Sequence, residues 1–168
     1  MTRFHFLLLL LAVCISALGS PPSLAAEFKS GDIAVENAWA RATPKGADVG
    51  VGYLTIHNNG SALERLTGGV ADFASVEVHE MTMVNGVMKM RALKNGLAIP
   101  AHGTVRLAPG GDHLMFTHLT KPLTKGEKVK ATLNFEHAPP LPVEFAVEGV
   151  GAAGPAGAKG GKMGGMKM

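Results

Sequence analysis

Residues 79–90, HEMTMVNGVMKM, concentrate soft metal-binding donors in one short stretch of the chain. They contain one histidine and four of the chain's nine methionines. Outside this stretch the methionines are Met1, Met115, Met163, Met166 and Met168. Methionine is usually a flexible filler scattered through a core. Its concentration here therefore predicts a chemical role for the thioether sulfurs.

The Asn85-Gly86 pair in the middle of this stretch predicts a β-hairpin, because both residues accept the positive φ angles of a type I′ turn. With a two-residue loop, side chains alternate between the two faces of the paired strands. One face is predicted to carry His79, Met81, Met83, Met88 and Met90. The other is predicted to carry Glu80, Thr82, Lys89 and Arg91, with Glu80 opposite Arg91. Since a core-facing hairpin would show the same alternation, the hairpin alone leaves both metal binding and core packing open.

A second pair of donors, His113 and Met115, lies two residues apart in GGDHLMFTHL. On a strand they share one face, whereas Leu114 and Phe116 point the other way, into the predicted core. With the hairpin, this pair can supply two imidazoles and at least two thioethers to one point. Thioethers are soft and imidazoles are borderline. Without thiolate or carboxylate, the set favours Cu(I) over Zn(II), Ca(II) or Mg(II).

Other candidate donors are weighed and left out of the site. Met81 is a possible auxiliary ligand, whereas packing is the expected role of Met83. The histidines that we do not assign to the site are His57, His102, His118 and His137. They lack a methionine partner, lie beside Pro or Gly in predicted loops, or have the wrong strand parity.

The elements that must position these donors are short β-strands. Runs of β-forming residues recur between Gly, Pro and Asn, and no segment keeps a helical period. The predicted strands are residues 33–37, 38–43, 49–58, 63–68, 75–84, 86–93, 104–109, 113–119, 128–136 and 142–149. This spacing predicts an all-β fold, an antiparallel sandwich or barrel.

Both ends of the chain differ in composition from this domain. Residues 1–25 predict a secretory signal, with a basic start, a short apolar run and small residues before a cut after about Ala25. Residues 26–150 are the predicted copper-binding β domain. Residues 151–168, rich in Gly, Lys and Met, are a predicted disordered tail. Its methionines either collect copper loosely or, as we expect, have no role.

The only cysteine, Cys14, lies inside the predicted signal. Val13 occupies the position where a lipoprotein site wants Gly or Ala, so we expect no lipid anchor. The mature chain then has no disulfide and no thiolate for metal binding or catalysis. A formal net charge of +3, few aromatics and dispersed lysines argue against nucleic-acid binding. No nucleophile–base arrangement stands out, so we expect no enzyme, and no stable membrane insertion after signal cleavage.

The spacing of the donors resembles a known signature. His79, ten residues, Met90 and then His113-Leu114-Met115 is similar to the motif of the PCu(A)C family of periplasmic copper chaperones. That motif is a His, ten residues, a Met, twenty-one residues and then His-x-Met. ENAWARATP, LAIPAHGTVRLAPGGDHLM and PVEFAVE also resemble family sequence. The similarity covers about residues 31–150, nearly the whole predicted domain.

This chain departs from the motif at one point. Twenty-two residues separate Met90 from His113, one more than in the motif. We place the extra residue in the turn at residues 94–96. An insertion within a strand would instead move His113 to the other face of the sheet.

The resemblance implies a cupredoxin-like Greek-key β-barrel that binds one Cu(I) per domain. The implied ligands are His79, Met90, His113 and Met115. It further implies a periplasmic protein that delivers copper to the Cu(A) centre of cytochrome c oxidase subunit II or to another acceptor. A thiol-based co-chaperone is a further expectation, since this chain has no redox cysteine.

Three other functions remain open from the sequence. The first is a periplasmic copper buffer that confers resistance without a dedicated acceptor. The second is a metal-free β interaction module. The third is a redox copper protein, but blue-copper sites normally use a cysteine thiolate, which the mature chain lacks.

Overall fold

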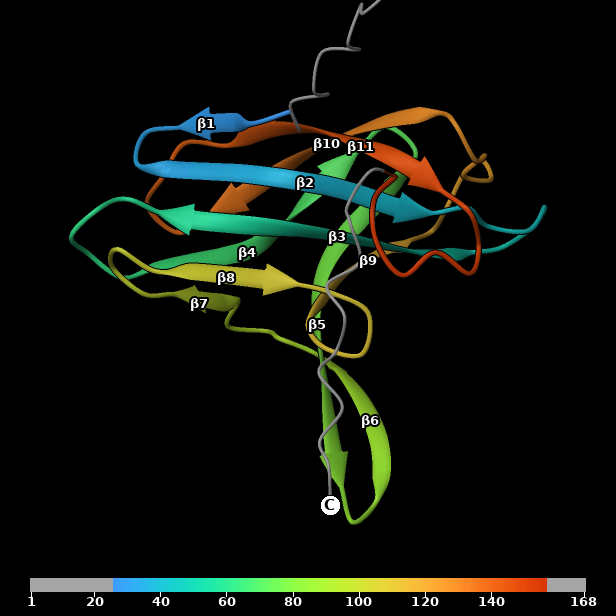
Figure 1. Ribbon diagram of the computed structural model, residues 1–168, viewed down its shortest axis with the longest axis horizontal. Coiled ribbons are helices and arrows are strands. Elements are labelled where there is room, and N and C mark those ends of the chain that lie inside the picture. The colour runs from blue at the N-terminus through green and yellow to red at the C-terminus, as the bar shows by residue number, and fades with distance from the viewer. Residues whose placement is uncertain (1–25, 157–168) are drawn as a thin grey trace, which may run out of the picture.

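The computed structural model describes residues 26–156, and within that range the chain forms strands and no helix (Figure 1). The strands are β1 (Phe28–Ser30), β2 (Ile33–Arg41), β3 (Val49–Asn58), β4 (Glu64–Ala71), β5 (Ala74–Val84), β6 (Val87–Ala92), β7 (Leu97–Ile99), β8 (Thr104–Leu107), β9 (His113–Thr117), β10 (Lys128–Phe135) and β11 (Leu141–Glu148). The all-β prediction is confirmed. Nothing in this part of the chain is a helix long and apolar enough to cross a membrane.

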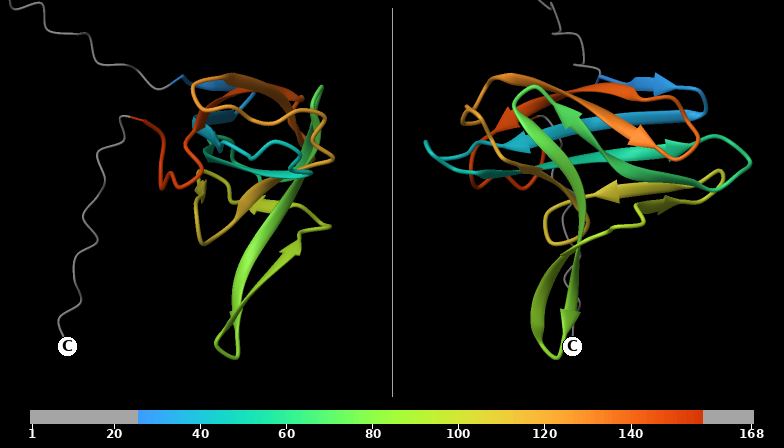
Figure 2. Two further views of the ribbon diagram at one scale, coloured as in Figure 1. Left: turned by 90° about the vertical axis from the view of Figure 1, so that its right-hand side faces the viewer. Right: turned by 180° about the vertical axis from the view of Figure 1, so that it is seen from behind.

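Seven strands close into a barrel in the order β2–β11–β10–β4–β5–β9–β3, because β3 pairs again with β2. The β11–β2 pairing is parallel and the other pairings of the ring are antiparallel. Strands β1, β6, β7 and β8 attach to this ring without being part of it. Figure 2 shows the barrel from two further directions, and in both the β5–β6 hairpin extends away from it.

The interior of the barrel is built by alternate residues of each strand. On β9, Leu114 and Phe116 are fully buried, as predicted from their parity. The Phe116 ring meets Phe145 of β11 edge-on, with ring centroids 5.6 Å apart. It also covers Gly52 of β3, where an added Cβ would lie 2.8 Å from the ring. These contacts fix β9 against its neighbours, because a close-packed interior leaves little room for a strand to shift.

Two differences from the predicted strands have local causes. Residues 33–37 and 38–43 were predicted as separate strands, but β2 joins them into one strand that ends at Arg41. It carries a bulge at Asn37, which has a φ of 55°, where the register with β3 shifts. Strands β1 and β7 were not predicted. Each is only three residues long, which is too short to show an alternating pattern.

Strand β5 belongs to two structures at once. Its first part pairs with β4 and β9 inside the barrel, and its last part pairs with β6 outside it. The turn between β5 and β6 is Asn85-Gly86, with φ angles of 51° and 77°. This confirms the predicted hairpin and its register, in which Met81 faces Met90 and Met83 faces Met88. Figure 1 shows the hairpin projecting from the barrel.

The segment after β11 begins in contact with the domain. Arg41 donates from Nε to the carbonyl of Ala152 at 3.0 Å. The backbone N–H of Ala156 donates to the Glu148 carboxylate at 2.8 Å. The methionines of the predicted tail lie outside the described residues, and so do the predicted signal and its cleavage site.

Candidate metal centre

The register between β5 and β9 sets His79 directly opposite His113. Their ring centroids lie 5.8 Å apart. Both side chains point away from the barrel interior, because their neighbours Val78 and Leu114 fill it. His113 is nonetheless only 5% exposed. Two imidazoles therefore face each other in a shielded position at the point where β5 leaves the barrel.

Each ring has one nitrogen that is held and one that is available. His113 donates from Nδ1 to the carbonyl of Gly111 at 3.0 Å, which leaves the lone pair on Nε2. His79 donates from Nε2 to the Glu77 carboxylate at 2.9 Å, which leaves the lone pair on Nδ1. A hydrogen bond at one ring nitrogen is the usual way to orient a metal-binding histidine through the other nitrogen.

The Nδ1 atom of His79 is buried and has no hydrogen-bond partner among the described residues. Buried polar atoms are nearly always paired, because an unpaired one costs roughly 1–3 kcal/mol. An imidazole lone pair opposite a second imidazole is the arrangement that a soft or borderline metal ion would satisfy. The donor chemistry of the site therefore fits copper.

Met115 supplies a thioether on the same face. It lies two residues from His113 on β9, opposite Glu77 on β5 and Val51 on β3. The side chain is 8% exposed, yet it does not belong to the core cluster of the described residues. The sulfur is thus shielded without being part of the barrel interior.

Met90 lies further out. It pairs with Met81 on the projecting hairpin and is 50% exposed, two residue pairs along the ribbon from the His79–Ala92 pair. Residues diagonal to each other on one face of a strand pair lie within reach of long side chains. Of the four predicted ligands, the structure brings His79, His113 and Met115 together on the barrel. It places Met90 at the base of the hairpin, on the same face.

Glu77 is the residue of the site that the sequence analysis missed. Glu77 lies beside His79 and accepts the hydrogen bond from its Nε2, so a carboxylate adjoins the predicted ligands although none was predicted among them. The signal was present in the sequence, since residues two apart on a strand share a face. Glu77 has neither sulfur nor imidazole, so a criterion based on soft and borderline donors does not select it.

The charged residues of the hairpin occupy its other face. Arg91 forms an ion pair with Glu80, as predicted. Burial raises the pKa of the nearby Asp112 carboxyl and the negative charge of Glu80 raises it further, while His113 opposes both effects. The donor face of the hairpin, in contrast, carries the methionines and His79.

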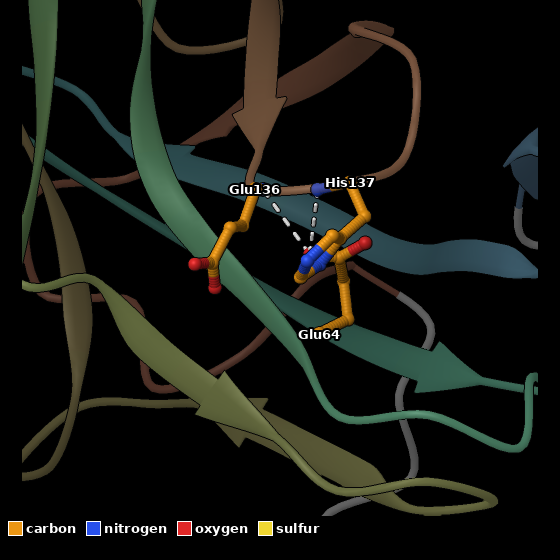
Figure 3. A group of neighbouring side chains, drawn as sticks. All are labelled: Glu64, Glu136 and His137. Carbon is orange, nitrogen blue, oxygen red and sulfur yellow. Dashed lines mark hydrogen bonds and ion pairs between the residues drawn. The ribbon is translucent and has the colours of Figure 1, made fainter.

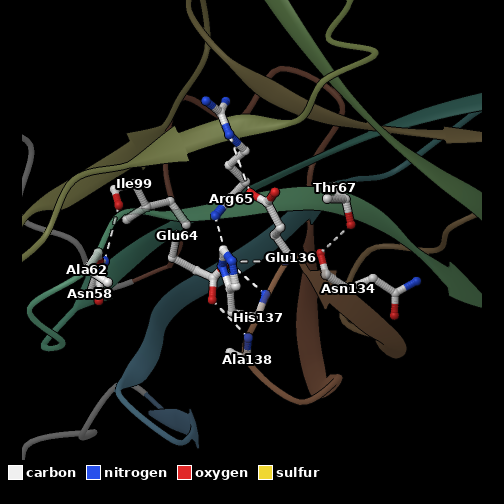
Figure 4. Close-up of polar contacts among 10 residues, drawn as sticks. All are labelled: Asn58, Ala62, Glu64, Arg65, Thr67, Ile99, Asn134, Glu136, His137 and Ala138. Atoms are coloured by element: carbon white, nitrogen blue, oxygen red, sulfur yellow. Dashed lines mark hydrogen bonds and ion pairs between the residues drawn. The ribbon is translucent and has the colours of Figure 1, made fainter.

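A second group of possible ligands lies elsewhere, where Glu64 of β4 meets Glu136 and His137 after β10 (Figure 3). The Oε1 atom of Glu64 accepts hydrogen bonds from the backbone N–H groups of Arg65, Glu136 and His137, and also from His137 Nδ1. Its Oε2 atom accepts one from the backbone of Ala138 (Figure 4). Both oxygens of this carboxylate accept hydrogen bonds from the chain itself, so the cluster holds the β10–β11 loop against β4.

Of the other histidines, His57 is held by an ion pair with Glu36 and a hydrogen bond with Thr104. His118 is exposed and directly follows β9, with a φ of 57°. His102 and His137 lie in loops, as predicted. None of the four lies on the donor face of β5 and β9.

Comparisons with known proteins give matches over most of the domain. The family model described as "Putative lipoprotein LpqE-like" matches residues 33–147. The chain is 34% identical over 142 residues to "Putative lipoprotein Lxx21020" of Leifsonia xyli subsp. xyli (strain CTCB07), covering 83% of this chain and 84% of that protein.

Solved structures are similar as well. The "Copper-bound PCuAC domain from PmoF2" is 29% identical with a TM-score of 0.61, covering 74% of this chain and 98% of that one. The solution structure of "CuI-DR1885" from Deinococcus radiodurans is 28% identical with a TM-score of 0.53, covering 79% and 85%. The cupredoxin-like fold expected from the sequence is thus confirmed.

The hydrogen bonds to Glu64 predict a pH-dependent contribution to stability. Burial alone would raise the pKa of its carboxyl, but the donors from Arg65, Ala138 and His137 outweigh burial and hold the pKa below its usual value. Glu64→Gln should lower the free energy of unfolding by about 2–4 kcal/mol at pH 7. Because the pKa is lowered on folding, this loss should shrink as the pH falls from the unfolded value of 4.5 through the folded one.

Urea unfolding of both proteins at several pH values measures this difference. Glu136→Gln is the matched control, because that carboxylate is half exposed and bonds only the Arg65 side chain. A Glu64→Gln effect independent of pH would mean that the ionised form is not what the loop requires.

The hydrogen bond from His79 to Glu77 predicts a single ring tautomer. In metal-free protein, ¹⁵N NMR of labelled histidine should show His79 protonated at Nε2 with a free Nδ1. Glu77→Ala should give a mixture of tautomers and weaken copper binding by about 10- to 100-fold. Glu36→Ala, which removes the carboxylate partner of His57, should leave the His79 signals unchanged. An unchanged tautomer in Glu77→Ala would show that something else orients the ring.

Proposed function

Since this chain belongs to the LpqE-like family and is a PCuAC-type protein, we propose that it is an exported Cu(I) chaperone. PCuAC domains are copper-binding domains, and one of the similar structures is a Cu(I) form. The observation that carries the proposal is the unpaired, buried Nδ1 of His79 opposite His113. Buried side-chain nitrogens in a core are nearly always hydrogen-bonded.

The proposed ligands are His79 Nδ1, His113 Nε2 and the sulfurs of Met115 and Met90, with Met81 as an auxiliary. All are neutral when they bind, so no proton has to leave and the bound ion keeps its positive charge. Two soft sulfurs and two borderline nitrogens favour Cu(I) over harder divalent ions. We propose one Cu(I) per domain, because the two imidazoles converge at a single place.

The proposed site has a shielded side and an open side. His113 and Met115 are buried on the barrel, whereas Met90 is half exposed on the hairpin. A ligand from an acceptor can therefore displace Met90 first, while the imidazoles still hold the ion. Cu(I) then moves by stepwise exchange of one bond for another and is not released into solution.

For the destination, we propose the Cu(A) centre of cytochrome c oxidase subunit II, in the periplasm. A thiol-based co-chaperone would keep the Cu(A) cysteines reduced, since no cysteine follows Cys14 in this chain. No catalytic step is proposed for the domain. A second candidate function is copper buffering, which would use the same site without a dedicated acceptor.

Export is supported by the relatives, which are described as putative lipoproteins. That description disagrees with the expectation that this chain carries no lipid anchor. Cys14, the residue that a lipid would modify, lies outside the described residues.

An anaerobic Cu(I) competition titration tests the proposed site. The mature domain should bind one tight equivalent. The double variant His113→Ala/Met115→Ala should weaken this binding by more than about 100-fold, because changes outside the ligand set already cost about 10- to 100-fold. His57→Ala/His102→Ala is the matched control and should bind as the unchanged protein does. Undiminished affinity in the first variant would falsify the site.

The rate of Cu(I) transfer to an acceptor protein distinguishes a chaperone from a buffer. The Cu(I)-loaded protein should metallate a purified, reduced Cu(A) domain faster than an equal concentration of a small-molecule Cu(I) complex of similar affinity. An unrelated apo copper protein of comparable affinity should gain no such advantage. Equal rates for the two acceptors would favour the buffer.

A further inference from the structure

The projecting hairpin carries more methionine than the proposed site uses. Met83 and Met88 face each other at its outer end and are 63% and 43% exposed. Neither belongs to the core cluster of the described residues, nor to the partly buried hydrophobics packed on it. These two side chains therefore do not pack in the way that the sequence analysis expected for Met83.

The position of this outer pair relative to the proposed site is fixed by the strand register. Side chains two residues apart on a strand share a face and lie about 6.5 Å apart. Moving inward from the turn, the pairs are Met83–Met88, then Met81–Met90, then His79 of β5 opposite His113 of β9. The donors form one continuous row from exposed tip to shielded barrel.

The choice of side chain within this row points to sulfur chemistry. Val84 and Val87, on the opposite face beside the same turn, are also exposed, so bulk or hydrophobicity alone does not require methionine there. Methionine has a long, flexible side chain and a polarisable sulfur. Two such sulfurs on directly opposite residues, with Cβ atoms about 4.5–5.5 Å apart, can converge on one soft ion.

We propose that Met83 and Met88 form an outer Cu(I)-capture site, which passes the ion inward through Met81 and Met90 to the imidazoles. This proposal rests on the function proposed above. In each step a bond from copper to the next donor forms as a sulfur–copper bond further out breaks, and in the last steps that donor is an imidazole nitrogen. The metal stays Cu(I), and no proton or electron moves. The direction is inward because two exposed thioethers offer fewer and weaker donors than two imidazoles with a buried thioether.

NMR with Ag(I), a redox-inert mimic of Cu(I), tests the outer site residue by residue. The protein is the full mature chain labelled at the methionine methyl groups. In the His113→Ala/Met115→Ala background, Ag(I) should still shift the Met83 and Met88 methyls, with weaker affinity than at the intact site. Adding Met83→Leu/Met88→Leu should abolish Ag(I) binding at the hairpin tip. Leucine keeps the size and hydrophobicity and removes only the sulfur.

The matched control is Val84→Leu/Val87→Leu, which alters the other face of the same turn and should leave the Ag(I) shifts unchanged. In the chain with an intact inner site, Met83→Leu/Met88→Leu should keep the tight Cu(I) equivalent and slow its loading. Circular dichroism checks that each variant keeps its sheet.

Two results would overturn the outer site. One is the absence of Ag(I) shifts at Met83 and Met88 in the background variant. The other is a Met83→Leu/Met88→Leu variant that loads normally but transfers copper poorly, which would make the tip a docking surface for an acceptor. Failure of the proposed function looks different, because the unchanged chain would then lack a tight Cu(I) equivalent whether or not the tip binds Ag(I).

Discussion

The pairing of β5 with β9 is the constraint on which the candidate site depends. It sets His79 opposite His113, and it is held by Val78 and Leu114, which point into the barrel from the same two positions. A slip of one residue would bury the imidazoles and expose those side chains, at a cost of several kcal/mol of lost burial. The hydrophobic core therefore fixes the register, and the register fixes the donors. The extra residue between Met90 and His113 leaves that register intact.

The sequence allowed local features to be predicted and left long-range ones open. Asn85-Gly86 determined the hairpin pairing from Glu80 to Arg91, because a two-residue turn permits one register. No local signal showed that β9 would lie beside β5, which only the closed barrel decides. The His113 hydrogen bond to Gly111 and the hydrogen bonds to Glu64 also depend on loop conformation. Glu77 alone could have been found from parity.

Two polar clusters in this fold show how hydrogen bonding separates a structural role from a binding one. Both oxygens of the Glu64 carboxylate accept hydrogen bonds from the chain itself, which gives the contact with Glu136 and His137 a structural role. His79 has one nitrogen occupied by Glu77 and the other buried without a partner. Both clusters bring side chains that can bind metal ions close together. What differs is that the His79 cluster leaves a buried nitrogen without a partner, and this nitrogen is the candidate metal ligand.

The division of donors between barrel and hairpin suits a protein that must bind copper and also release it. Donors on the barrel are held by strands paired on both sides, since β9 lies between β5 and β3. Donors on the hairpin lie on a two-stranded ribbon with no core behind it, and such ribbons are marginally stable by themselves. Ligands on the barrel give a defined geometry, and ligands on the ribbon can move away at little cost. An ion bound across the two is retained by the barrel donors while a hairpin donor exchanges, so retention and release need not oppose each other.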